Sequence, residues 1–306
     1  MSYRPMITLT GSVDIHLHSG PSYSHSRPYD DEITAKHAFE EGLAGIVIKD
    51  HTESTVTRAY LAQKAVPGIR VFGGITLNHP VGGINPEAAD FALTMGGKEV
   101  WMPTVDSARH AEVFGQGGYA LKGARIDPVE PEKKSRHLLK KRPISILVDG
   151  KLTDEAKDVV KICQIWDAML GTSHLSEEEI VELGMFAQAE GFQKLIITHA
   201  NWTIVSGKNP LQFVIKMAQM SAWIEMVGSA MYPPYNCVTV HDDIRWIKEV
   251  NSERVVLASD TGAAGPAAHE PSVFRSYLQL LNNAGLPMDR IKLMGFDNPR
   301  RLVHMA

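Results

Sequence analysis

Two histidines stand at alternate positions early in the chain, in the segment VDIHLH at residues 13–18. The apolar residues around them favour a β-strand, in which positions i and i+2 point to the same side. The rings of His16 and His18 are therefore expected to share one side, together with Asp14. Two imidazoles placed in this way can hold one metal ion. A single pair of this kind can also be solvated or hydrogen-bonded without a metal.

Three further groups that can bind a metal follow apolar runs elsewhere in the chain. His174 ends the run DAMLGTSH, His199 lies in KLIITHAN, and Asp260 ends VVLASD. Several buried imidazoles without partners would cost about 1–3 kcal/mol each, whereas one metal ion would satisfy these groups together. We therefore predict a metal site. Its predicted ligands are His16, His18, His174, His199 and Asp260.

These residues need a scaffold that brings the ends of distant strands together. Eight short β-rich runs alternate with helical patterns, and this alternation is typical of parallel βαβ units. The runs are 13–18, 45–51, 71–78, 99–104, 167–174, 194–201, 222–227 and 255–260. Several helical segments begin with Ser, Asn or Asp and end at Gly or Asn, which supplies capping groups. The pattern predicts an α/β fold, a closed (β/α)8 TIM-type barrel, with the candidate ligands on the rim formed by the carboxyl ends of the strands.

One interval between strand ends is much longer than the others, because 70 residues separate Thr104 from His174. We interpret residues 105–152 as an insertion after the fourth strand, a lid or interface segment within a single barrel domain of residues 1–306. The insertion contains a hairpin signal, with Asp149 and Gly150 at the turn. It also contains KKSRHLLKKR, in which six of ten residues are Lys or Arg. This run lacks aromatic residues for base stacking, so we interpret it as a solvated face or a subunit contact.

The composition limits the partners and the compartment. The 306 residues are 44% hydrophobic, which suffices for a sizeable core, and the formal net charge of −4 argues against broad binding to nucleic acid. Cys163 and Cys237 are too few for a disulfide framework or a cysteine metal site. The first residues lack the apolar stretch of a signal peptide, and no apolar run approaches the ~18 residues of a membrane span. We expect a cytoplasmic protein with a small-molecule substrate and no membrane contact, for which a homo-oligomer is possible.

The ordered set of motifs resembles the amidohydrolase superfamily of metal-dependent hydrolases. The resemblance lies in DxHxH on the first strand, single histidines closing the fifth and sixth strands, Asp260 closing the eighth, and FDNPRRLV near the end of the chain. Segments such as DIHLHSGP and VWMPT are similar to an uncharacterised branch of that superfamily. The resemblance runs from His16 to Pro299 and implies a TIM-type barrel with a divalent metal. Zinc is the first expectation, and manganese, iron and nickel are alternatives. The site could hold one or two ions.

The fourth strand departs from that pattern. Relatives with two metal ions usually carry a bridging Glu or carboxylated Lys, commonly on this strand, which here ends in Met102-Pro103-Thr104. Lys49 and His51, at the end of the second strand, share a side and could replace the bridge. A buried lysine can be neutral, and a neutral amine can take up carbon dioxide to become an oxygen ligand. Alternatively, Lys49 is a cation that binds an anionic substrate or pairs with Asp14 or Asp50.

The roles of the remaining candidates follow from their chemistry. A divalent ion with imidazole and carboxylate ligands lowers the pKa of its water to about 7. We expect Asp260 to take the proton of this water and later to protonate the leaving group, and we count His199 with it as catalytic. Arg27 could hold a carboxylate or phosphate in bidentate fashion. The candidates for substrate binding are Arg27, Asn78, Thr104, Asn201 and Trp202. The other eight histidines, His110 among them, lie in loops or helices and are not expected to be ligands.

Three functions are consistent with these residues. The first is a metal-dependent hydrolase of the amidohydrolase type that acts on an amide, cyclic amide, lactone or related ester. The second is a metal-dependent non-oxidative decarboxylase of the same superfamily, which the missing ligand on the fourth strand favours. The third is a non-catalytic barrel that binds a metal or a metabolite.

Overall fold

Eight parallel strands form one sheet in the order β1-β2-β3-β4-β7-β8-β9-β10. The structure is a computed structural model that describes residues 5–23, 27–115, 142–202, 210–233, 235–250, 252–262 and 270–305. The strands are β1 (Val13–His18), β2 (Gly45–Lys49), β3 (Arg70–Thr76), β4 (Glu99–Trp101), β7 (Met169–Gly171), β8 (Leu195–Ile197), β9 (Trp223–Val227) and β10 (Val255–Ala258). All eight coincide with predicted runs, although most end two or three residues earlier than expected.

The last strand returns to the first and closes the sheet. The N–H of Asp260 donates to the carbonyl of His16 at 2.8 Å, and the N–H of His18 donates to the carbonyl of Thr261 at 2.8 Å. Because these bonds join β10 to β1, the strands form the closed (β/α)8 barrel that the alternation predicted.

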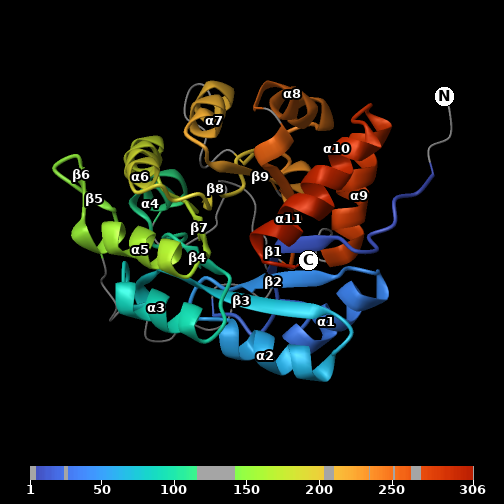
Figure 1. Cartoon of the computed structure of the whole chain (residues 1–306), viewed down its shortest axis with the longest axis horizontal. Helices are drawn as coiled ribbons and strands as arrows, with labels where there is room; N and C mark the ends of the chain where they lie inside the picture. Colours follow the sequence, from blue (N-terminus) through green and yellow to red (C-terminus); the bar gives the residue numbers. More distant parts are fainter. Residues whose placement is uncertain are drawn as a thin grey trace.

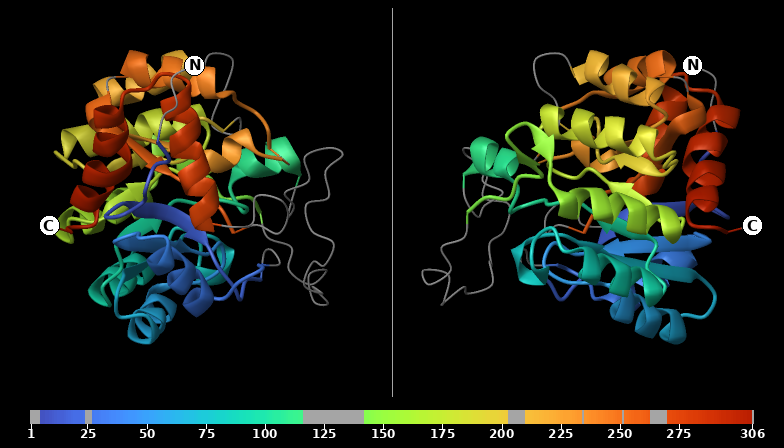
Figure 2. Two further views of the ribbon diagram at one scale, coloured as in Figure 1. Left: turned by 90° about the vertical axis from the view of Figure 1, so that its right-hand side faces the viewer. Right: turned by 60° about the vertical axis from the view of Figure 1, so that its left-hand side comes forward.

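Helices surround the strands on all sides (Figures 1 and 2). In Figure 1, α1 and α2 lie below the strands and α7 and α8 lie above them. The helices are α1 (Asp31–Glu40), α2 (Val56–Ala65), α3 (Pro86–Thr94), α4 (Ala108–Phe114), α5 (Asp154–Ile165), α6 (Glu177–Ala189), α7 (Pro210–Gln219), α8 (Val240–Val250), α9 (Glu270–Asn283), α10 (Met288–Lys292) and α11 (Asn298–Leu302). Among the described ranges, no helix is both long and apolar enough to cross a membrane.

The predicted capping groups are in place at several helix starts. Ser176 and Glu179 form a capping box at the start of α6, and the side chains of Asp30 and Asn85 accept backbone N–H groups at the starts of α1 and α3. Thr153, which was not predicted, does the same at the start of α5. Each such cap is worth about 1 kcal/mol of helix stability, because it satisfies a donor that the helix itself leaves without a partner.

The predicted hairpin lies in the insertion. Strands β5 (Leu147–Val148) and β6 (Lys151–Leu152) pair antiparallel around Asp149 and Gly150, both of which have positive φ. Residues 116–141 lie outside the described residues, and so does the basic run except for Arg142.

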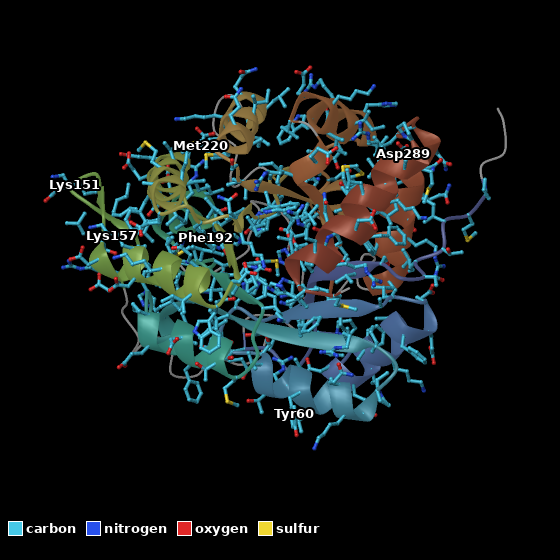
Figure 3. All side chains as sticks on the ribbon, in the orientation of Figure 1. Tyr60, Lys151, Lys157, Phe192, Met220 and Asp289 are labelled. Atoms are coloured by element: carbon cyan, nitrogen blue, oxygen red, sulfur yellow. The ribbon has the colours of Figure 1, made fainter. Side chains whose placement is uncertain are left out.

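Two buried layers result from the alternation of side chains along the strands. One layer packs the outward side chains of the strands against the helices, and the other fills the barrel interior with residues such as Ile15, Val47 and Ile196. In Figure 3 side chains crowd the space between strands and helices, whereas Tyr60 and Asp289 point outward from α2 and α10. The alternation that places Val47 in the interior also points Lys49 inward, toward the rim.

Trp101 of β4 packs into the interior of the barrel. The Trp101 side chain is fully buried, and it lies where the β-carbons of other residues would stand at two neighbouring strands. A Cβ added at Gly74 would lie 2.6 Å from Trp101 Cζ3, and one at Gly171 would lie 2.6 Å from Trp101 Cδ1. The two glycines therefore leave space for the indole, whose ring centroid lies 6.3 Å from that of His16.

Candidate metal centre

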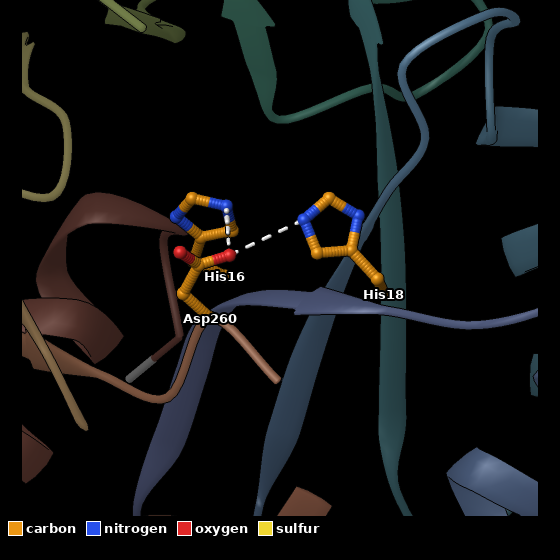
Figure 4. Close-up of side chains that lie close together, drawn as sticks. All are labelled: His16, His18 and Asp260. Atoms are coloured by element: carbon orange, nitrogen blue, oxygen red, sulfur yellow. Dashed lines mark ion pairs between the residues drawn. The ribbon is translucent and has the colours of Figure 1, made fainter. Parts of the chain in front are cut away.

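Two histidines of β1 and an aspartate after β10 meet at one point of the rim (Figure 4). His16 Nε2 lies 3.2 Å from Asp260 Oδ1, and His18 Nε2 lies 3.3 Å from the same oxygen. One ligand atom of each residue lies within 4.8 Å of the other two. The two imidazoles are buried, whereas the Asp260 side chain is 17% exposed, so the aspartate is the member of the trio that solvent can reach.

Hydrogen bonds on the other ring nitrogens define how the two histidines face Asp260. His18 Nδ1 lies 2.9 Å from the carbonyl oxygen of Lys49, which can only accept, so this Nδ1 carries the proton. His16 Nδ1 lies 3.0 Å from Glu225 Oε2, which also accepts the backbone N–H of His199 at 2.7 Å. Both rings therefore have Nε2 facing a carboxylate oxygen, and with the proton on Nδ1 the Nε2 atom of each can act as a metal ligand. Lys49 Nζ can donate to one of these three acceptors, since it lies 3.2 Å from His16 Nε2. A divalent metal ion would satisfy all three at once, so this donor set fits such an ion.

The trio lies where β1 pairs with the residues that follow β10, and we call this pairing the seam of the barrel. Asp14, expected beside the two rings, instead accepts the backbone N–H groups of Ser259 at 3.0 Å and His16 at 3.2 Å. The pairing of β1 with β2 shifts register between Asp14 and Leu17, which interrupts the strict alternation on which that expectation rested. Burial raises the pKa of Asp14 to about 6. The seam also requires Gly262 at φ +103°, because a Cβ there would lie 1.8 Å from the carbonyl oxygen of His18.

Lys49 reaches the same point from β2. Its Nζ lies 3.2 Å from His16 Nε2 and 5.2 Å from the centroid of the Trp101 ring, and the residue is 1% exposed. Burial lowers the pKa of Lys49, while the negative charges of Asp260, Glu225 and Glu99 oppose that effect. Its Nζ thus lies beside one imidazole of the trio.

His174 and His199 lie beside the trio. The ring centroid of His199 is 6.0 Å from that of His16 and 5.1 Å from that of His174. Burial lowers the pKa of both histidines well below the usual value. Neither ring nitrogen of His199 has a hydrogen-bond partner among the described residues. A buried neutral imidazole in this state costs about 1–3 kcal/mol, which binding to a metal or a substrate would offset.

Left-handed backbone marks the loops that carry these groups. His199 and Asp260 have φ values of 37° and 49°, and Ser173, next to His174, has φ 54°. Such conformations cost non-glycine residues about 1–3 kcal/mol and cluster at functional sites. They arise because the strands end before these residues, so the chain turns at the rim and aims the side chains inward.

The remaining predicted metal ligand, His51, lies on the far side of His18. The two rings stack with centroids 4.8 Å apart, and His51 Nδ1 lies 2.9 Å from Thr104 Oγ1. Asn78 completes this cluster by donating to the carbonyl of His51 at 2.7 Å and to Thr104 Oγ1 at 2.6 Å. The polar groups of Asn78 and Thr104 are thus engaged in holding His51, which is a different task from the predicted contact with substrate.

The other predicted substrate contacts have different environments. Asn201 donates to the carbonyl of Val227 at 3.1 Å and to Asp243 at 3.0 and 3.1 Å, so its amide joins β9 to α8. Trp202 packs edge-on against His199, with centroids 5.0 Å apart, and against His174 at 5.4 Å. The charge of Arg27 contributes to the lowered pKa of Lys49, which places its guanidinium within electrostatic range of the site.

The structure adds to the site three residues that were not among the predicted metal ligands and substrate contacts. Glu225 and Trp101 point into the barrel from β9 and β4. His110 of α4, which we did not expect near the ligands, is fully buried with its Nδ1 2.9 Å from His174 Nδ1. A carboxylate within the apolar run WIEMV was a usable signal for Glu225. No local signal marked His110, because its contact depends on where the insertion folds.

Comparisons with known proteins agree with this architecture. An amidohydrolase from Pseudomonas aeruginosa has a TM-score of 0.59 at 10% identity, over 96% of each chain. A zinc-bound amidohydrolase from Burkholderia multivorans has a TM-score of 0.58 at 11% identity, over 96% of this chain and 99% of that one. A 2,6-dihydroxybenzoate decarboxylase from Rhizobium has a TM-score of 0.54 at 12% identity, with the same coverage. At these identities the likeness establishes the fold, which is the TIM-type barrel that the resemblance implied.

Sequence comparisons are less specific. A family model described as a family of unknown function (DUF6282) matches residues 11–225, which include all the predicted metal ligands except Asp260. No curated protein matches the sequence.

Proposed function

We propose that this chain, which belongs to the family of unknown function DUF6282, is a metal-dependent hydrolase of an amide, cyclic amide, lactone or related ester of a small molecule. One observation carries the proposal. His16 Nε2 and His18 Nε2 converge on Asp260 Oδ1 at 3.2 and 3.3 Å, while the opposite ring nitrogens are held by Glu225 and by the Lys49 carbonyl. Residues arranged in this way are prepared to bind a cation.

The trio and the neighbouring imidazoles would hold a divalent ion, with zinc as the first candidate because its usual protein ligands are imidazole and carboxylate. When bound, such an ion supplies a water of lowered pKa and polarises a substrate oxygen. His174 and His199 complete the set of imidazoles available to the ion or to the substrate.

Asp260 is the residue that we propose for proton transfer. Its Oδ1 faces the two histidines, while its Oδ2 accepts a hydrogen bond from Ser229 Oγ at 3.3 Å. As the most exposed member of the trio, it can reach a nucleophilic water and then a leaving group. A carboxylate in this position acts first as general base and then as general acid. His199, beside it, would orient or polarise the substrate.

Two cations favour a substrate with an anionic group. Lys49 Nζ lies at the centre of the site, and Arg27 is close enough to act on its pKa. A substrate carboxylate would relieve the repulsion between these cations. Alternatively, a carboxylated Lys49 would supply an oxygen ligand to a second metal ion, and metal stoichiometry in Lys49→Ala distinguishes these roles.

Non-oxidative decarboxylation is the second candidate. The observation that favours it is that His16, His18 and Asp260 are the one group of three possible ligands among the described residues, while Trp101, with its ring centroid 6.3 Å from that of His16, ends β4 in place of a metal ligand. A site for one ion beside two cations suits the binding and loss of a carboxylate.

Metal analysis of the purified full chain tests the proposal first. We expect about one bound divalent ion per chain in the wild type, loss of that ion in His16→Asn and Asp260→Asn, and retention in His304→Asn, which alters a distant exposed histidine. Turnover of amides, lactones and esters in 18O-labelled water then identifies hydrolysis by label in the organic product. Release of carbon dioxide from a carboxylic acid substrate, with no label in the organic product, identifies decarboxylation. Absence of metal binding with zinc, manganese, iron and nickel alike would refute both functions.

A further inference from the structure

We propose that His110 is a positioning residue, which accepts the Nδ1–H of His174 and so directs the Nε2 lone pair of His174 toward the metal centre. The proposal rests on the metal centre of the proposed function and assigns a task to a residue of the insertion. The two residues are 64 positions apart in the chain, yet both are buried, at 0% and 1% exposure.

The two imidazoles meet edge to edge. Their planes differ by 13° and their centroids are 5.0 Å apart, but the two Nδ1 atoms are only 2.9 Å apart. Rings stacked face to face cannot bring atoms much closer than ~3.5 Å, so the short distance is that of an N–H···N hydrogen bond. One Nδ1 must donate and the other must accept, because a neutral imidazole has one N–H and one lone pair.

Ser107 also joins the backbone of His174 to the start of α4. Ser107, the residue that caps α4, accepts the backbone N–H of His110 at 3.0 Å and donates its hydroxyl to the carbonyl of His174 at 2.7 Å. The start of α4 therefore holds both the backbone and the ring of His174. Two attachment points fix the rotation of the ring, which a single bond would leave free.

The direction of the hydrogen bond follows from the other histidines of the site. His16 and His18 each have Nδ1 bound to an acceptor, Glu225 or the Lys49 carbonyl, and each presents Nε2 to the centre. His174 has the same arrangement if His110 is the acceptor. In the opposite tautomer, His174 would carry its proton on Nε2 and could not bind a metal through that atom.

Paired substitutions at position 110 test the acceptor role. In His110→Asn, the side-chain oxygen can stand near the position of Nδ1 and accept the same proton, whereas His110→Leu has similar bulk and no acceptor. We expect zinc affinity, measured by competition with a chromogenic chelator, to fall about 10–100-fold in His110→Leu and to stay close to wild type in His110→Asn. Unchanged affinity in His110→Leu would overturn the proposal. Equal loss in both variants would also overturn it, because it would make His110 a direct ligand.

A spectroscopic measurement keeps the test decisive even if the leucine variant does not fold. Nitrogen NMR of zinc-loaded wild-type protein with 15N-labelled histidine reports which ring nitrogen of His174 carries the proton, with His174→Gln used to assign the signal. We expect the proton on Nδ1, and a proton on Nε2 would overturn the proposal. If the wild type binds no metal, the proposed function fails. If it binds metal and loses it in His16→Asn but not in His110→Leu, the positioning role alone fails.

Discussion

Replacing Asp243 with asparagine should change how the stability of the protein depends on pH. Asp243 lies in α8, is fully buried, and accepts hydrogen bonds from the Asn201 amide and from the Tyr277 hydroxyl at 2.7 Å. Burial raises its pKa from 3.8 to about 7, although both hydrogen bonds oppose the change. The folded state therefore binds a proton at this site more tightly than the unfolded state does.

The magnitude follows from linkage. Because the pKa is higher in the folded state, stability from this group is complete below pH 3.8 and falls as the pH rises toward 7. Each pH unit costs about 1.4 kcal/mol while the folded carboxyl stays protonated, and this slope halves at its pKa. The wild type should therefore lose about 2 kcal/mol between pH 5 and pH 7 from this residue. Asparagine does not titrate, but it loses one accepted hydrogen bond, at a cost of about 1 kcal/mol at any pH.

Urea denaturation of wild type and Asp243→Asn from pH 5 to pH 8, with chelator present in both, measures this effect. The chelator keeps metal binding from contributing to the unfolding free energy. We expect the free energy of unfolding of Asp243→Asn, minus that of wild type, to increase by about 3 kcal/mol from pH 5 to pH 8. Asp242→Asn is the matched control, because hydrogen bonds from Thr239 lower the pKa of Asp242 and keep its titration below this range. A constant difference between wild type and Asp243→Asn would refute the reasoning and show that the hydrogen bonds outweigh burial.

Three further predictions concern the barrel interior. Gly171→Ala should destabilise the protein by about 1–3 kcal/mol in thermal or urea unfolding, because the new Cβ would lie 2.6 Å from Trp101 Cδ1, whereas Gly295→Ala, with its nearest contact at 3.4 Å, should be close to neutral. Glu99→Gln should remove a loss of stability with rising pH, because burial and the charge of Glu225 raise the pKa of Glu99 well above its usual value; an unaltered pH profile in urea unfolding would contradict this. Glu225→Gln should weaken zinc binding about 10–100-fold in chelator competition, since it removes the charge behind His16 while keeping an acceptor, and wild-type affinity would show that this charge is unimportant.

Much of the fold could be predicted because its signals are local. Each strand is an apolar run with its own periodicity, several helix starts have a capping side chain nearby, and the turn at Asp149 and Gly150 is a property of two residues. The candidate ligands were recognisable for the same reason: His16 and His18 are spaced by the period of a strand, and polar groups such as Asp260 follow apolar runs. Closure of eight βαβ units then places all such ends on one rim.

Which residues at the strand ends contact one another was decided by the tertiary structure. The register shift in β1 moved Asp14 away from the two rings and into the seam with Ser259, although strict alternation predicted otherwise. The partner of His16 is Glu225, and that of His174 is His110, from elements far away in the chain. A residue's type and spacing determine what it can bind and which side of its own strand it faces. Its partner is decided by the shear and closure of the barrel and by the path of the insertion, which are set by the packing of the whole chain at once.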